Sequence, residues 1–232
     1  MALCHLKNAE MAEVFQSYKG RIVFRGDNIK DELGHYAVFT EQGTSSSHMA
    51  GTRFCDIVAR FPKCKGEDKD AEGAFTQITL AEAARLLGIN SIPQTWISLP
   101  KERHPPEWEG IEDPVCPLIG NLYGHPLAGL LWDKSSQEKI LACGFEKIPG
   151  WESLYVHRKK GLFLGVYVDD FHMAGWATTM ESAWEDIGKL IDFGDCKNFN
   201  GTTYLGCTQD SITVPRDVID EKRELFAKFL EN

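Results

Sequence analysis

Two adjacent aspartates, Asp169 and Asp170, lie between an apolar, partly β-branched run at residues 161–168 and a second run at 171–175. The pattern predicts two strands with both carboxylates at the turn between them. Like charges this close raise one another's pKa, and apolar surroundings strengthen the repulsion. A divalent cation removes that penalty, and Mg²⁺ prefers hard oxygen ligands. The pair is therefore a candidate metal site, although Asp-Asp turns are also common in hairpins that bind nothing.

A second acidic motif lies upstream, where Asp70 is followed after three residues by Ala74 and Phe75. Together with Tyr167-Val168-Asp169-Asp170, this motif resembles the two metal-binding motifs of reverse transcriptases. The resemblance implies two Mg²⁺ ions, bridged by the first aspartate of each motif. It implies three catalytic and metal-binding residues: Asp70, Asp169 and Asp170. It also places Phe75 under the sugar of the incoming nucleotide, where its ring would favour deoxynucleotides; taken alone, Phe75 fits a core aromatic at a helix start.

Further segments resemble the Ty/copia retrotransposon branch of this family, in the family's order over about residues 19–208. Details of residues 122–129 and 204–209 resemble forms common in dinoflagellates. The resemblance assigns five residues to nucleotide binding: Lys19, Arg21, Phe75, Tyr123 and Gly124. It assigns three residues to the primer grip: Tyr204, Leu205 and Gly206. For Lys19 and Arg21, a solvated basic strand face is the alternative interpretation.

The fold implied is α+β, with the fingers and palm of a reverse transcriptase. From Asp70 onward the elements read strand, helix, strand, strand, helix, strand, which suits a split β-α-β, ferredoxin-like antiparallel sheet. We expect helices on one face of this sheet and a second face free for substrate. The expected divisions are fingers at 1–66, palm with the first catalytic motif at 67–90, a fingers insertion at 91–122, palm with the Asp-Asp hairpin at 123–210, and a palm-to-thumb connection stub at 211–232.

Hydrophobic periodicity and turn residues predict the individual elements. Helices are expected over 5–18, 47–60, 76–87, 128–142, 180–191 and 217–230. Strands are expected at 21–25, 36–40, 95–99, 161–168, 171–175 and 203–207. A long exposed loop is expected over the proline-rich residues 100–114. The polar residues 65–69 are poor strand formers, so the strand that should deliver Asp70 is expected to be short or decayed.

Composition limits the choice of function. The 232 residues are 43% hydrophobic and 25% charged, as in an ordinary folded protein. Seven cysteines without a Cys-x-x-Cys pair argue against a zinc ribbon and read as reduced side chains. No apolar run suits a membrane helix and the N-terminus lacks a secretory signal, so we expect an intracellular protein of the cytoplasm or nucleus. The net charge of −9 argues against tight, unaided nucleic-acid binding.

Three hypotheses follow. The first is an RNA-directed DNA polymerase in which a primer 3′-hydroxyl attacks the α-phosphate of a deoxynucleoside triphosphate. Its partners would be an RNA template, a DNA primer, the triphosphate and other domains of the element's polyprotein. The second is an inactive or domesticated fragment, favoured by the acidic total, the absent thumb and the polar stretch before Asp70. The third is a two-metal nuclease, which no additional acidic or histidine motif for activating water supports.

Overall fold

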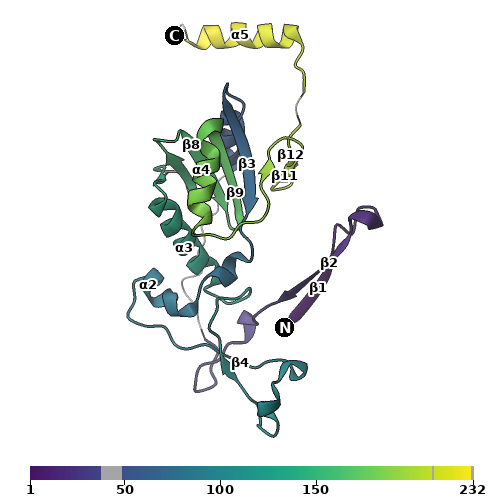
Figure 1. The fold of residues 1–232 in the computed structure, drawn as a ribbon, viewed down its shortest axis with the longest axis vertical. Coiled ribbons are helices and arrows are strands. Elements are labelled where there is room, and N and C mark those ends of the chain that lie inside the picture. Colours follow the sequence, from purple (N-terminus) through teal and green to yellow (C-terminus); the bar gives the residue numbers. More distant parts are fainter. Residues whose placement is uncertain (38–48, 211, 231–232) are drawn as a thin grey trace.

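The computed structural model describes residues 1–37, 49–210 and 212–230, and the chain is organised around a six-stranded antiparallel sheet (Figure 1). The strands lie in the order β10-β3-β9-β8-β7-β6. Their bounds are β3 Cys64–Asp70, β6 Glu146–Lys147, β7 Leu154–His157, β8 Leu162–Tyr167, β9 Asp170–Trp176 and β10 Lys197–Asn198. Helices lie between β3 and β6 and between β9 and β10, so the expected α+β class is confirmed.

Two helices, α3 (Ala128–Ala142) and α4 (Ala177–Gly188), cover one face of the sheet (Figure 1). Successive side chains of a strand point to opposite faces, so alternate residues of the central strands enter this layer. Leu164, Phe171 and Met173 do so and are fully buried. This layer is the larger of the two hydrophobic cores in the described part of the chain.

The opposite face of the sheet is covered by α1 (Met49–Val58). Cys55 of α1 packs there with Ala174 of β9 and with the ring of Phe199. Room for that ring comes from Gly66 of β3, because a Cβ at this position would lie 2.2 Å from ring carbons of Phe199. The expectation of helices on one face only is therefore wrong, because α1 packs on the second face.

The strand β3 forms in full, although its residues are polar. The charged side chains inside the strand find partners: Glu67 accepts a hydrogen bond from Trp184 Nε1 at 3.0 Å, and Asp68 pairs with His172. The Lys69 ammonium lies 5.3 Å from the centroid of the Trp184 ring. The prediction of a short or decayed strand is wrong because these tertiary contacts override the low strand propensity.

The N-terminal segment is a hairpin and not the expected helix over 5–18. Its strands β1 (Ala2–Lys7) and β2 (Ser17–Ile22) pair in antiparallel fashion around a connection with a 3₁₀ turn at Glu13–Phe15. The apolar spacing that suggested a helix belongs to one strand face and to exposed residues of this connection. The strand expected at 21–25 thus ends earlier, at Ile22.

Several other predictions are confirmed in their type and approximate position. They concern α1, α3, α4, β8, β9 and the final helix α5 (Arg216–Leu230), with residues 47–48 lying outside the described part. The strand expected at 95–99 is the shorter β4 (Trp96–Ile97), which pairs with β5 (Cys116–Pro117) across the expected loop. That loop carries 3₁₀ turns at Lys101–Arg103 and Pro106–Trp108.

Three further predictions need correction or lie outside the described residues. The helix expected over 76–87 is divided into 3₁₀ turns at Ala74–Gln77 and Leu80–Glu82 and the short α2 (Ala83–Leu87), because a Thr79–Glu82 capping box begins a new helix. The expected strand at 203–207 is a hairpin of β11 (Thr203–Tyr204) and β12 (Cys207–Thr208). Residues 38–40 of the strand expected at 36–40 are not described; Tyr36 forms an isolated bridge with Lys30.

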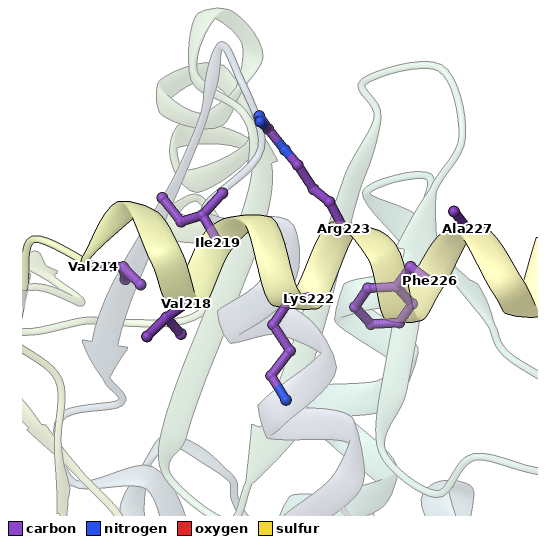
Figure 2. A pocket seen from close by; sticks show the side chains of 7 residues that line it. All are labelled: Val214, Val218, Ile219, Lys222, Arg223, Phe226 and Ala227. Atoms are coloured by element: carbon purple, nitrogen blue, oxygen red, sulfur yellow. The ribbon is translucent and has the colours of Figure 1, made fainter.

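The helix α5 stands apart from the sheet and its covering helices (Figure 1). Figure 2 shows the side chains that line a pocket along this helix and the chain before it. They are Val214, Val218, Ile219, Lys222, Arg223, Phe226 and Ala227. Across the described ranges, no helix combines the length and apolar character needed to span a bilayer.

The contact between Gly66 and Phe199 can be tested by adding one methyl group. Gly66→Ala forces Phe199 out of place, and we expect it to lower the free energy of unfolding by about 1–3 kcal/mol. Gly188→Ala at the end of α4 is the matched control, because its added Cβ meets nothing within 4 Å. That variant should be as stable as the wild type or up to about 1 kcal/mol more stable. Urea unfolding measures both, and equal stability of the two variants would contradict the packing described.

Candidate active site at one end of the sheet

The turn between β8 and β9 carries the Asp-Asp pair. Tyr167 and Asp170 are cross-strand partners, which leaves Val168 and Asp169 as the two turn residues. Val168 has a φ of 56°, a conformation that costs energy for a β-branched residue. The buried Trp132 of α3 donates a hydrogen bond from Nε1 to the Val168 carbonyl at 2.6 Å. The core helix thus holds the turn in a strained conformation, as is typical of functional sites.

The third aspartate is brought to the same place by strand pairing. Asp70, the last residue of β3, is the direct cross-strand partner of Asp170, the first residue of β9. The Ala71 N–H donates to the Asp169 carbonyl at 2.8 Å, and the Gly194 N–H donates to the Asp70 carbonyl at 2.9 Å. Residues from distant parts of the sequence are therefore fixed together by backbone hydrogen bonds.

The carboxylates destabilise one another. Burial, followed by the charges of Asp169 and Asp70, raises the pKa of Asp170 to about 6. Burial and the charge of Asp169 also raise the pKa of Asp70, while Lys19 and Lys197 act in the opposite direction. Hard oxygen donors whose mutual repulsion is unrelieved are the chemistry that a divalent cation fits. In the described ranges no three acidic, histidine or cysteine side chains already converge as a metal cage.

The residues assigned to nucleotide binding lie beside these carboxylates. The rings of Phe75 and Tyr123 are 4.7 Å apart, and the Arg21 guanidinium lies 5.7 Å from the Tyr123 centroid. Burial, then the negative charge of Asp169, raises the pKa of Tyr123, so this ring is electrostatically close to the acidic cluster. The effect of Lys19 on Asp70 places its charge near the same cluster.

Gly124 joins the N-terminal segment to this site. Its φ is 88°, and a Cβ there would lie 2.1 Å from the Phe24 carbonyl oxygen. A Cβ on Gly26 would likewise lie 2.2 Å from the Gly124 carbonyl oxygen. Between them, the Phe24 N–H donates to the Tyr123 carbonyl at 2.7 Å. Two glycines therefore let two backbones cross at a distance that no side chain permits.

Of the three residues assigned to the primer grip, Tyr204 ends β11, and Leu205 and Gly206 form the β11–β12 turn. Leu205 and Gly206 have φ values of 46° and 79°, which give a tight connection. The Tyr204 ring is buried and stacks on His172 with 4.2 Å between centroids. Its hydroxyl is buried without a hydrogen-bond partner in the described part of the chain. Burial, then the charge of Asp170, raises the pKa of Tyr204, and its ring rests on His172, two residues along β9 from Asp170.

Sequence reasoning missed a polar cluster on the same face of the sheet. His172 is completely buried, with Nδ1 2.5 Å from Asp68 Oδ1 and Nε2 3.1 Å from Asp56 Oδ1. Burial opposes the imidazolium, but the hydrogen bonds to Asp56 and Asp68 outweigh it and raise the pKa of His172. The signal available was one ionisable residue within an otherwise apolar strand, on the face of Asp170.

Comparison of the sequence with protein-family models and with curated proteins gives no match to either.

The repulsion within the acidic cluster predicts how stability depends on pH. The folded pKa of Asp170 lies above its ordinary value, so the contribution of Asp170 to stability falls as pH rises through about 4 to 6. Asp170→Asn removes this loss. In metal-free buffer at about pH 7.5 the variant should unfold at a higher temperature than the wild type, and the difference should shrink toward about pH 4. Added Mg²⁺ should raise the wild-type midpoint more than that of the variant.

Asp186→Asn is the control of opposite sign. Hydrogen bonds from Lys160 and Lys189 lower the pKa of Asp186 to about 2, so its contribution is present at neutral pH and is lost in acid. This variant should unfold at a lower temperature than the wild type at neutral pH, with the wild-type response to Mg²⁺. Scanning calorimetry checks both variants; midpoints of Asp170→Asn and wild type that run parallel from about pH 4 to 8 would contradict the predicted repulsion.

Proposed function

We propose that this chain is the fingers and palm portion of an RNA-directed DNA polymerase of the copia type. The observation that most directly supports this proposal is the pairing of Asp70 with Asp170 across adjacent strands, beside Asp169 in the turn. The order β10-β3-β9-β8, with α3 before β8 and α4 after β9, also supports a split β-α-β palm. The divisions expected from the sequence belong to this proposal.

The acidic residues would act as metal ligands. Asp70 and Asp169 are the bridging ligands in this proposal, and Asp170 completes the cluster next to Asp70. Two Mg²⁺ ions, when bound, would supply Lewis-acid stabilisation of the attacking and leaving oxygens of a phosphoryl transfer. The protein's contribution is to hold the oxygen donors on a hydrogen-bonded strand edge and a strained turn, which need little reorganisation.

The N-terminal hairpin would supply positive charge to the triphosphate. Strand alternation and the β1–β2 register put four residues on one face of this hairpin: His5, Lys7, Lys19 and Arg21. The positive charge of Lys19 opposes the rise in the pKa of Asp70, and that of Arg21 opposes the rise in the pKa of Tyr123. A protein with a net charge of −9 thus still presents local positive charge beside its acidic site. This arrangement supports the binding of a deoxynucleoside triphosphate between the hairpin and the sheet.

The remaining substrates would occupy the exposed end of the sheet. The hairpin with Tyr204, Leu205 and Gly206 would hold the DNA primer, paired to an RNA template. We place such a protein inside the cell, acting with other domains of the element's polyprotein. The alternatives are a folded but inactive or domesticated fragment and a two-metal nuclease, which the first experiment below separates from polymerisation.

Primer extension on an RNA template with Mg²⁺ tests the proposal. The wild type should extend the primer, and Asp169→Asn should lower the rate by at least about a thousandfold, because one hard oxygen donor is lost. Circular dichroism should show the same fold for both. A folded wild type that extends no primer would support the inactive fragment, and cleavage of the template without extension would support a nuclease.

The ring of Phe75 predicts discrimination between sugars. The ring is half-buried against Tyr123 and belongs to a 3₁₀ turn. Thr76 Oγ1 donates a hydrogen bond to the Gly73 carbonyl in this turn, so the ring has little freedom to move away from a substrate. Phe75→Val opens space for a 2′-hydroxyl, and the ratio of ribonucleotide to deoxynucleotide kcat/KM should rise about ten- to a hundredfold. Phe61→Val removes an exposed ring after α1 and should leave this ratio unchanged. Single-nucleotide insertion kinetics measure the ratio; an unchanged ratio for Phe75→Val would remove its assigned role.

A further inference from the structure

The β11–β12 hairpin is not part of the six-stranded sheet. Among the described strands, β11 and β12 pair only with each other, through Thr203 with Thr208 and Tyr204 with Cys207. Two residues per strand are too few for an isolated hairpin to hold its own position in water. Its place beside the catalytic edge must therefore depend on side-chain contacts with neighbouring elements.

The first such contact is made by Gln209, directly after β12. Gln209 Nε2 donates a short hydrogen bond to Asp56 Oδ1 of α1. Its amide oxygen accepts a hydrogen bond from Arg60 Nη2 at 3.0 Å. The Gln209 carbonyl also accepts from the Gly201 N–H at 2.7 Å, which closes the base of the hairpin. Gln209 is therefore fixed at both ends of its amide group and ties the hairpin to α1.

The second contact is the ring of Tyr204, which rests on His172. The imidazole lies between two rings: Phe199 at 3.8 Å with an interplanar angle of 3°, and Tyr204 at 4.2 Å with an angle of 28°. Asp68 and Asp56 engage its two nitrogens, so the ring cannot turn without breaking a hydrogen bond. His172 thus offers Tyr204 a fixed plane, two residues along β9 from Asp170.

The hydrogen bonds form one continuous chain, Asp68–His172–Asp56–Gln209, which we call the buried polar relay: Asp68 and His172 are buried, and Asp56 and Gln209 are partly exposed. The free energy lost when these polar groups are removed from water indicates that the relay does more than stabilise the fold. Carboxylates and an imidazole lose solvation when buried, and apolar side chains of similar volume are often equally stabilising. Hydrogen bonds add what apolar contacts lack, a single direction for each group. The relay links α1, the β3–β9 pair and the hairpin in one defined arrangement.

We infer that the buried polar relay positions the β11–β12 hairpin over Asp170, which makes His172 and Gln209 positioning residues for the primer end. The inference rests on the proposed function and extends it to residues that touch neither metal nor nucleotide. Loss of the relay should move the primer terminus relative to the carboxylates, whereas the nucleotide pocket of Phe75 and Tyr123 stays intact.

Gln209 is the residue to change, because it is partly exposed and its loss leaves both cores intact. Gln209→Leu keeps the size but removes the hydrogen bonds. Gln209→Glu keeps an acceptor for Arg60 but sets a carboxylate against Asp56, so it should be the more damaging change. Glu146→Gln is the matched control: Glu146 lies on β6 at the far edge of the same sheet, and the change removes the charge that accepts the 2.9 Å hydrogen bond from Arg158 Nε.

Steady-state primer extension gives the first readout. For Gln209→Leu, kcat/KM for the primer–template should fall about ten- to a hundredfold, because a small misplacement of the reacting groups is costly. The KM for the deoxynucleotide should stay within about twofold of the wild type. Glu146→Gln should match the wild type in both quantities. A merely structural role of Gln209 would lower all activities together, in step with the unfolding temperature.

Hydrogen exchange of the backbone amides gives a readout that needs no activity. Gln209→Leu should speed exchange in residues 203–208 and leave β3 and β9 protected. Unchanged exchange in that hairpin overturns the inference whatever the kinetics show. An active wild type whose Gln209→Leu variant has normal primer kinetics overturns the inference alone. A wild type that does not extend primers overturns the proposed function, and the primer role of the relay with it.

Discussion

The pairing of β3 with β9 is the constraint on which the rest of the structure depends. It sets Asp70 opposite Asp170, and the same register sets Asp68 opposite His172 and Gly66 opposite Ala174. A shift of one residue would move every side chain of β3 to the other face. The acidic pair, the buried polar relay and the space for Phe199 would then all be lost together. One register therefore specifies the site, its support and the packing of the second core.

The three carboxylates of β3 differ in their surroundings: Glu67 and Asp68 are buried, and Asp70 is exposed. Glu67 and Asp68 are satisfied by Trp184 and His172, and they serve the structure. Asp70, at the end of the strand, meets another carboxylate instead. The inner charges of the strand are satisfied by hydrogen bonds, and its last carboxylate is repelled by a neighbouring one. The unfavourable electrostatic energy is therefore concentrated at the end of β3. That contrast explains how a polar segment can form a strand inside the sheet and still end in an acidic cluster.

Local sequence patterns predicted the parts of the fold that local interactions decide. The Asp-Asp hairpin, α3 and α4 follow from apolar runs and periodicity, and the structure has them close to the expected residues. The N-terminal hairpin was missed because Leu6, Met11 and Val14 happen to recur at helical spacing. The strand β3 was undervalued because its charged side chains are satisfied by His172 and Trp184, which lie 104 and 117 residues from their partners in the sequence.

The candidate site shows the same division. Motif resemblance named the three aspartates, but the cross-strand meeting of Asp70 and Asp170 depends on long-range pairing that no local pattern contains. His172 escaped notice because its partners Asp56 and Asp68 lie in two other elements. Trp132, which holds the strained turn, is separated from Val168 by many residues and bonds to a backbone carbonyl. Such supporting groups carry no motif of their own.

The crossing of two backbones at Gly26 and Gly124 has a consequence for how this chain tolerates mutation. Neither residue offers a functional group, yet any side chain at either would push apart the segment that follows the N-terminal hairpin and the turn that precedes α3. The size of the added side chain would then determine the distance between the basic face of the hairpin and the aspartates. In a complete substitution map, these two positions should therefore be as intolerant as the acidic residues, and for a purely geometric reason.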